Sequence, residues 1–224
     1  MAAAIQQSLL PPAGRDGAFF TTAGASIPCR AVGGDFSTTS TWRAGNLASS
    51  WAMWPGKALQ PRCSRLQRWA CSAPRRHAQP SAAPLLVRLN RGLFRRSIEA
   101  RFLTTFYGIL GTDGSLTYSN GGHNAPVLLT NNSVRRLETG GVVLGLFEHA
   151  SYDEETVSLN RGDVIIAFSD GVSEALNETG DEFTDERLLD SIAAHRGKAP
   201  QELLDGVVAD VRARFVVARL KATT

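Results

Sequence analysis

Acidic residues are missing from a long stretch of this sequence. Between Phe36 and Ile98 there is no Asp or Glu, whereas the same stretch holds 11 Lys and Arg residues and all four tryptophans. The rest of the 224-residue chain carries the other 13 basic residues and all 21 acidic ones, a net charge of −8. The overall charge of +3 therefore averages two unlike regions. A basic segment with aromatic residues is typical of a nucleic-acid-binding arm, which is one interpretation of the stretch.

Long apolar runs, a leader peptide and paired cysteines are also lacking. No run of 18 apolar residues is present, so no membrane span is expected. Met1 to Leu10 lacks the charged and apolar regions of a signal peptide. Cys29, Cys63 and Cys71 do not have metal-binding spacing, and we expect free thiols in a reducing cytoplasm. The length and the 43% apolar composition predict one globular domain, residues 1–224.

The pattern of apolar residues is that of a mixed α+β fold. It predicts helices over 2–10, 85–97, 185–195 and 200–215, and strands over 19–31, 102–110, 115–118, 125–130, 155–159 and 164–168. The last two strands are expected to form a hairpin. Because 164–168 is apolar on both faces, we expect it to be a central, buried strand. No sustained period is found from Ser37 to Ala83, which predicts loop or disorder.

Two aspartates are candidates for binding a hard cation. Asp170 follows the apolar run 164–168 and precedes Gly171, and Asp35 follows Gly33 and Gly34. Carboxylate oxygens are ligands of Mg²⁺ and Mn²⁺, and glycines allow the backbone to approach closely. Asp-Gly and Gly-Asp are also ordinary turn dipeptides, so neither motif identifies a site by itself.

The order of short motifs along the chain is more informative than any one of them. In sequence the motifs are Ile5-Gln6-Gln7-Ser8-Leu9-Leu10-Pro11, Val32-Gly33-Gly34-Asp35-Phe36, Phe102-Leu103-Thr104-Thr105-Phe106-Tyr107-Gly108, Tyr118-Ser119-Asn120-Gly121-Gly122-His123-Asn124-Ala125-Pro126, Val143-Leu144-Gly145, Gly162-Asp163-Val164 and Phe168-Ser169-Asp170-Gly171-Val172-Ser173-Glu174-Ala175. This series resembles the bacterial stress-response phosphatases related to SpoIIE and RsbU, within the PPM (PP2C-like) superfamily. The resemblance covers roughly residues 2–36 and 85–215.

The resemblance implies a fold, an activity and a metal site. The implied fold is a PP2C-like α-β-β-α sandwich of two antiparallel sheets flanked by helices. The implied activity is metal-dependent hydrolysis of phosphoserine or phosphothreonine in a regulatory protein of the anti-sigma-factor antagonist type. Two Mn²⁺ or Mg²⁺ ions activate water in such a site, so no protein nucleophile is needed. The resemblance assigns these residues as follows: Asp35 and Asp170 as metal ligands, Gly34 and Gly171 as metal-site turn residues, and Asn120, His123 and Asn124 as structural turn residues.

Two metal-binding elements of the family are absent from the sequence as written. An Asp-Val-x-Gly-Lys-Gly motif is expected within 37–84, and an Asp-Asp pair is expected after Phe215, where this sequence reads Val216 to Thr224. The codons of Trp51 to Ala58, read from the third base of each, can encode Gly-Asp-Val-Ala-Gly-Lys-Gly. Those of Lys221 to Thr224, with a following stop, can encode Gly-Asp-Asp-Met in the same shifted frame.

We therefore infer frameshifts near Ser37, between about Arg75 and Leu85, and near Phe215, so that 37–84 and 216–224 are out of frame. Out-of-frame GC-rich codons yield Arg, Pro, Ser and Trp with few acids, which explains the basic stretch without a nucleic-acid partner. Two alternatives to an enzyme remain: a pseudophosphatase that binds its partner without turnover, and a pseudogene product. A diguanylate cyclase, prompted by Gly33-Gly34-Asp35-Phe36, would need a second acidic residue before the Phe.

Overall fold

The structure is a computed structural model, and it describes residues 14–25, 35–41, 47–53, 81–95, 102–131 and 133–214. The chain divides into two compact units, each described here by itself. One unit holds the described residues between 35 and 167, and the other holds 14–25 and 168–214. The helix expected at 2–10 and the three cysteines lie outside the described residues.

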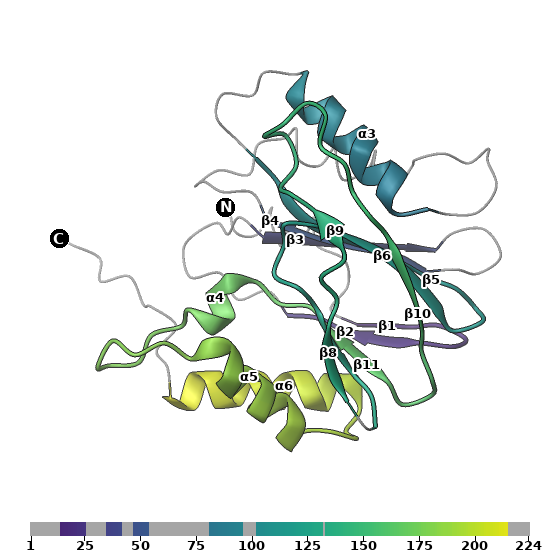
Figure 1. Cartoon of the computed structure of the whole chain (residues 1–224). Coiled ribbons are helices and arrows are strands. Elements are labelled where there is room, and N and C mark those ends of the chain that lie inside the picture. Colours follow the sequence, from purple (N-terminus) through teal and green to yellow (C-terminus); the bar gives the residue numbers. More distant parts are fainter. Residues whose placement is uncertain are drawn as a thin grey trace, which may run out of the picture. The chain divides into compact units, whose positions relative to one another are not determined.

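The first unit is built on a large, mainly antiparallel sheet (Figure 1). Its strands run in the order β10-β6-β5-β4-β3, and the short β9 pairs in parallel with β6. In chain order their bounds are β3 Asp35–Thr41, β4 Leu47–Met53, β5 Thr104–Leu110, β6 Ser115–Gly121, β9 Gly140–Gly141 and β10 Glu155–Ser158.

Strands β5 and β6 confirm the strands expected over 102–110 and 115–118 and form a hairpin, whose turn shows why the chain reverses there. Gly114 has a φ of +81°, a conformation that side chains with a Cβ rarely adopt. The Asp113 carboxylate accepts hydrogen bonds from the Ser115 hydroxyl (2.6 Å) and backbone N–H (3.0 Å). These hydrogen bonds, that of the hydroxyl first, hold the pKa of Asp113 below its usual value. The turn therefore fixes the register of two inner strands.

Strands β3 and β4 correct the expectation of loop or disorder for 37–41 and 47–53. They pair in register from Asp35↔Met53 to Thr41↔Leu47, and β4 also pairs along its whole length with β5. An inner strand has its backbone groups satisfied on both edges, so it does not depend on an alternating pattern of side chains. The Ser, Thr and Trp residues of these spans include good strand formers. Residues 54–80 lie outside the described part of the chain.

A second sheet in the same unit has the order β11-β7-β8. Its strands are β7 Val127–Leu129, β8 Val134–Arg136 and β11 Val164–Ile166. The expected hairpin of β10 with β11 is wrong, because β10 pairs with β6 and β11 pairs with β7. The turn 160–163, closed by a 2.8 Å bond from Asn160 N to the Asp163 carboxylate, carries the chain between sheets. Among the described strands β11 is an edge strand and half-buried, which corrects the expectation of a central, buried one.

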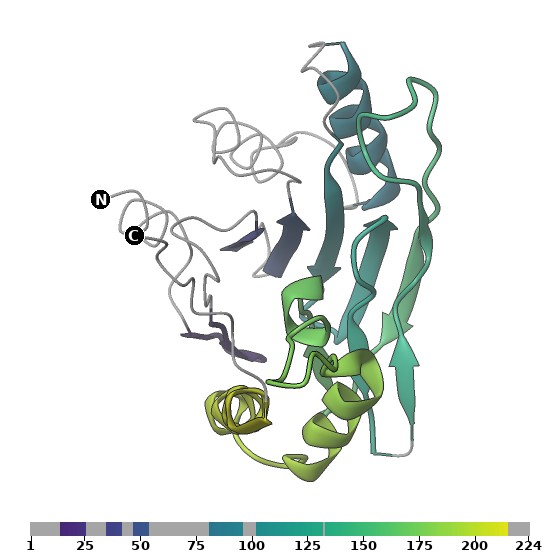
Figure 2. The same cartoon turned by 90° about the vertical axis from the view of Figure 1, so that its left-hand side faces the viewer.

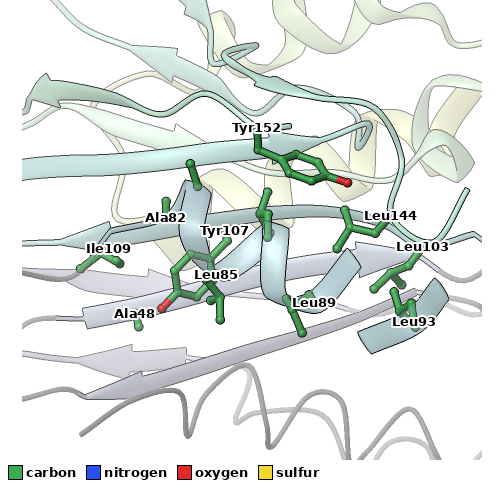
Figure 3. Close-up of a cluster of buried hydrophobic side chains, with 12 residues drawn as sticks. Ala48, Ala82, Leu85, Leu89, Leu93, Leu103, Tyr107, Ile109, Leu144 and Tyr152 are labelled. Carbon is green, nitrogen blue, oxygen red and sulfur yellow. The ribbon is translucent and has the colours of Figure 1, made fainter. Parts of the chain in front are cut away.

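Strand β5 separates the two cores of this unit. On one face, Tyr107 and Ile109 pack with leucines of α3 (Ala83–Phe94), and Leu144 and Tyr152 complete the cluster (Figure 3). On the other face, Phe106 belongs to a cluster that includes Tyr118 from the large sheet and Leu128 from the small one. Because side chains alternate along a strand, one strand serves both cores, and a helix and two sheets form three layers.

The described residues of the second unit form a two-stranded ribbon and three helices. The ribbon pairs β1 Gly14–Asp16 with β2 Thr21–Ala23, and α6 contacts β2. The helices are α4 Asp170–Ser173, α5 Thr184–Ala194 and α6 Pro200–Arg214. Helices α5 and α6 confirm the two expected from the sequence and lie side by side (Figure 2). No helix in the described part of the chain has the length and apolar character needed to cross a bilayer.

Candidate functional site

The turn after β6 is closed by one carboxamide. Asn120 donates from Nδ2 to the carbonyl oxygen of His123 (2.9 Å) and accepts at Oδ1 from the N–H of His123 (2.8 Å). Both residues are buried, so the two bonds satisfy polar groups that water does not reach. Gly122 has a φ of +71°, and a Cβ there would lie 2.6 Å from a methyl carbon of Val143. The geometry of this turn thus depends on Asn120, Gly122 and His123, and Asn124 follows them half-buried.

Thr104, at the start of β5, is a neighbour of this turn that the sequence analysis did not single out. Its hydroxyl oxygen lies 3.1 Å from Nδ1 of His123, and both side chains are buried. Thr105, the next residue, forms a bridge with Gly122. The sequence feature that could have indicated this contact is the pair of adjacent threonines in an otherwise apolar strand, because buried hydroxyls need a polar partner.

Asp170 is the first residue of α4, four positions after β11 ends. It is half-buried, and among the described residues its carboxylate has no hydrogen-bond partner. Its backbone carbonyl accepts from Glu174 N (2.8 Å), which closes the single helical turn. The next residue, Gly171, lies in that turn, and a Cβ there would meet only the Ser169 hydroxyl oxygen at an ordinary 3.8 Å. The backbone itself therefore does not require glycine at this position.

Asp35 is the first residue of β3, and it pairs with Met53 of β4. Asp35 and Asp170 belong to different units of the chain, and Gly34 lies outside the described residues. Within the described ranges no three His, Cys, Asp or Glu side chains come together in a way that could hold a metal ion. A site for two divalent cations needs several carboxylates close together. Among the described residues no complete set of ligands for such a site is present.

A carboxylate network connects the two sheets of the first unit. Glu155 of β10 accepts hydrogen bonds from the Tyr118 hydroxyl (2.6 Å), the Thr139 hydroxyl (2.8 Å) and the Arg135 guanidinium of β8. These hydrogen bonds, that of Tyr118 first, lower the pKa of Glu155 from 4.5 to about 2. Burial, together with the nearby Glu155, raises the pKa of Tyr118. This network was not predictable from the sequence, because Tyr118, Arg135, Thr139 and Glu155 are far apart in the chain.

A match to a known family model shows which protein family this chain belongs to. The family model described as "Stage II sporulation protein E (SpoIIE)" matches residues 65–219, more than half of the chain. The chain belongs to the SpoIIE family. The matched span includes His123 and Asp170 but not Asp35, and it begins inside the stretch 37–84 that the sequence analysis assigns to a shifted frame.

Individual proteins similar to this SpoIIE-family chain are consistent with the family match. It is 28% identical to the phosphoserine phosphatase RsbU of Bacillus subtilis over 186 residues, which cover 80% of this chain and 54% of RsbU. The chain thus spans about half the length of that relative. The SiaA-PP2C domain of Pseudomonas aeruginosa superposes with a TM-score of 0.69 at 16% identity, covering 95% of this chain and 87% of that one. RsbX, solved in complex with magnesium, gives 0.55 at 15% identity, covering 83% and 82%. The fold is therefore of the PP2C type, as expected from the sequence.

Proposed function

We propose that this domain derives from a metal-dependent protein phosphatase that acts on phosphoserine or phosphothreonine in a regulatory protein, and that its activity is impaired in the sequence as written. The observation that carries the proposal is the SpoIIE-family match over 65–219. That span contains Asp170, a half-buried carboxylate whose side chain has no hydrogen-bond partner among the described residues. The phosphoserine phosphatase activity of RsbU supports this class of substrate. By the same resemblance the target is an anti-sigma-factor antagonist type of protein.

The register of β3 with β4 supports the inferred frameshift. In the shifted frame, the Asp codon of the missing motif spans the codons of Ala52 and Met53. The structure pairs Phe36 with Ala52 and Asp35 with Met53. A restored aspartate would therefore lie on the strand next to Asp35, at or beside the position directly opposite it. Two neighbouring carboxylates at one end of a strand pair can supply part of the oxygen ligands of a divalent-cation site.

Impairment follows from charge. The two family ligands present in the sequence, Asp35 and Asp170, carry two negative charges, whereas two divalent cations carry four positive ones. The family motifs that supply further carboxylates are absent from the sequence as written. Metal affinity depends on the number and placement of charged oxygen ligands, so we expect weak binding.

A second candidate function is binding without turnover. It is favoured by a specific observation: β4 occupies an inner position in the sheet although its sequence lacks the family motif. A domain that keeps its sheet and lacks a complete metal site could still hold a phosphoprotein partner. A binding assay that detects the partner while no phosphate is released would favour this candidate.

The test begins with the DNA. Resequencing codons 36–86 and 215–224 shows whether the open frame is continuous with the family motifs. In a protein expressed from the restored frame, Asp170→Asn should abolish phosphate release from a phosphoserine peptide while the melting temperature without metal stays nearly unchanged. The matched control is Asp190→Asn, an exposed aspartate of α5, which should keep full activity. Full activity of Asp170→Asn would refute the assignment.

A further inference from the structure

Exposed apolar side chains gather at one place on the first unit. Seven large hydrophobic residues of the described chain are exposed. Four of them, Phe94, Val142, Leu146 and Phe147, line one shallow groove of about 700 Å³, with exposures from 39% to 56%. Single exposed apolar residues are common, but a contiguous group of them marks an interaction surface. We call this surface the α3 groove, because Phe94 ends α3 and the other three follow β9.

The backbone of the α3 groove is held in place by a buried side chain. Asn90 of α3 is fully buried. Its Nδ2 donates to the carbonyl oxygens of Phe147 (2.8 Å) and Glu148 (3.2 Å), and its Oδ1 accepts from the N–H of Gly145 (2.7 Å). Leu146 and Phe147 therefore point to solvent from a segment whose backbone is fixed. The hydrogen-bonded backbone thus keeps these two side chains exposed. A surface held in this way loses little conformational entropy when it binds a partner.

The same connecting segment also holds the other end of α3. The Glu154 carboxylate accepts hydrogen bonds from the Ser81 hydroxyl (2.8 and 3.0 Å) and from the N–H of Ala83 (2.8 Å), the first residue of the helix. A carboxylate at a helix N-terminus satisfies free N–H groups and interacts favourably with the helix dipole. The groove is thus one rigid part of the α3 layer.

The charge of the groove indicates what fits it. Its lining residues include the carboxylates of Glu148 and Asp153 and the imidazole of His149, whose Nε2 lies 3.9 Å from the Glu148 carboxylate, and none of them is Lys or Arg. The groove is open and has no converging buried polar groups, unlike the deep pockets that bind small molecules. Apolar grooves of this kind accept the apolar face of an amphipathic helix. We propose that the α3 groove docks an amphipathic helix of a partner protein, with apolar residues on one face and Lys or Arg at its borders.

The proposal is independent of phosphatase activity and is tested by binding. The probe is a fluorescein-labelled helical peptide, the Lys peptide, with Leu at positions i, i+3, i+4 and i+7 and Lys on the flanking positions. A second, control peptide, the Glu peptide, has Glu in place of each Lys. Fluorescence anisotropy with the full chain should show that the Lys peptide binds and that the Glu peptide binds at least about tenfold more weakly. Glu148→Lys with Asp153→Lys should reverse this preference. Equal binding of both peptides would overturn the proposal.

Matched variants locate the binding. Leu146→Ser and Phe147→Ser should each weaken binding of the Lys peptide by about tenfold or more, as expected of central apolar contacts. Leu176→Ser and Val134→Ser are the controls, because those residues are each 48% exposed and do not line the groove. They should leave the affinity unchanged. If Leu146→Ser has no effect on the peptide, or if it abolishes self-association seen by sedimentation, the occupant is not the proposed helix.

Discussion

Two of the three buried tyrosines of the first unit, Tyr118 and Tyr152, differ in whether the hydroxyl group has a partner. The Tyr118 hydroxyl donates to Glu155 at 2.6 Å, whereas the Tyr152 hydroxyl has no partner among the described residues. Burial raises the pKa of Tyr152 to about 12, so the group stays neutral. A hydrogen bond to a charged group contributes about 1.5–3 kcal/mol, and a buried polar group without a partner costs about 1–3 kcal/mol.

The pair makes a matched test. Tyr118→Phe should lower the free energy of unfolding by about 1.5–3 kcal/mol, because it removes the hydrogen bond to Glu155. Tyr152→Phe should leave stability unchanged or raise it, because it removes a hydroxyl without a described partner. Urea unfolding followed by fluorescence measures both. Equal losses in the two variants would contradict the hydrogen bonding described for these residues.

The lowered pKa of Glu155 leads us to expect that the folded chain loses stability in acid. Its pKa is about 2 in the folded chain, below the ordinary 4.5, because Tyr118, Arg135 and Thr139 donate to the carboxylate. A lowered pKa in the folded state means that the ionised carboxylate stabilises the fold above about pH 4.5. This contribution is lost as the pH falls from 4.5 toward 2. Melting temperatures across that window should fall more steeply for the natural chain than for Glu155→Gln, and identical slopes would contradict the network.

At the scale of elements, α3 depends on the segment that follows β9. Asn90→Ala leaves the Gly145 N–H and two carbonyl groups without their partner, and an unsatisfied buried group costs about 1–3 kcal/mol. We expect a loss of stability in that range and faster hydrogen exchange at Gly145. Asn160→Ala, an exposed turn residue that hydrogen-bonds through its backbone, is the control and should change little. Unchanged exchange at Gly145 in Asn90→Ala would refute the role given to Asn90.

Some helices and strands could be predicted from sequence patterns, and others could not. The helices α5 and α6 and the strands β5 and β6 were predictable from the sequence, because their apolar periods act over neighbouring positions. The partners of β10 and β11 were not, because pairing with β6 and β7 is decided by contacts distant in sequence. Strand β4 was missed for a related reason: its place between β3 and β5 comes from backbone pairing, which leaves no period in the side chains.

At the scale of the whole molecule, the family was predictable from the order of motifs, and the geometry around it was not. The Asn120 and His123 turn could be named from sequence, whereas the Thr104 contact with His123 became visible only when β5 and β6 were placed side by side. The metal ligands Asp35 and Asp170 stay predictions, because the described residues hold no group of three metal-binding side chains. The missing carboxylates are absent from the sequence itself, and a shifted reading of the codons of Ala52 and Met53 explains the absence of one of them.

We propose that this PP2C-type domain of the SpoIIE family, as its sequence is written, lacks carboxylates that turnover needs. The measurement that tests it most directly is Mn²⁺-dependent hydrolysis of p-nitrophenyl phosphate by two proteins assayed side by side, the chain as written and the chain from the restored frame. We expect negligible turnover by the chain as written, and turnover by the restored chain that rises with Mn²⁺ and is lost in Asp170→Asn. Turnover by the chain as written equal to that of the restored chain would contradict it.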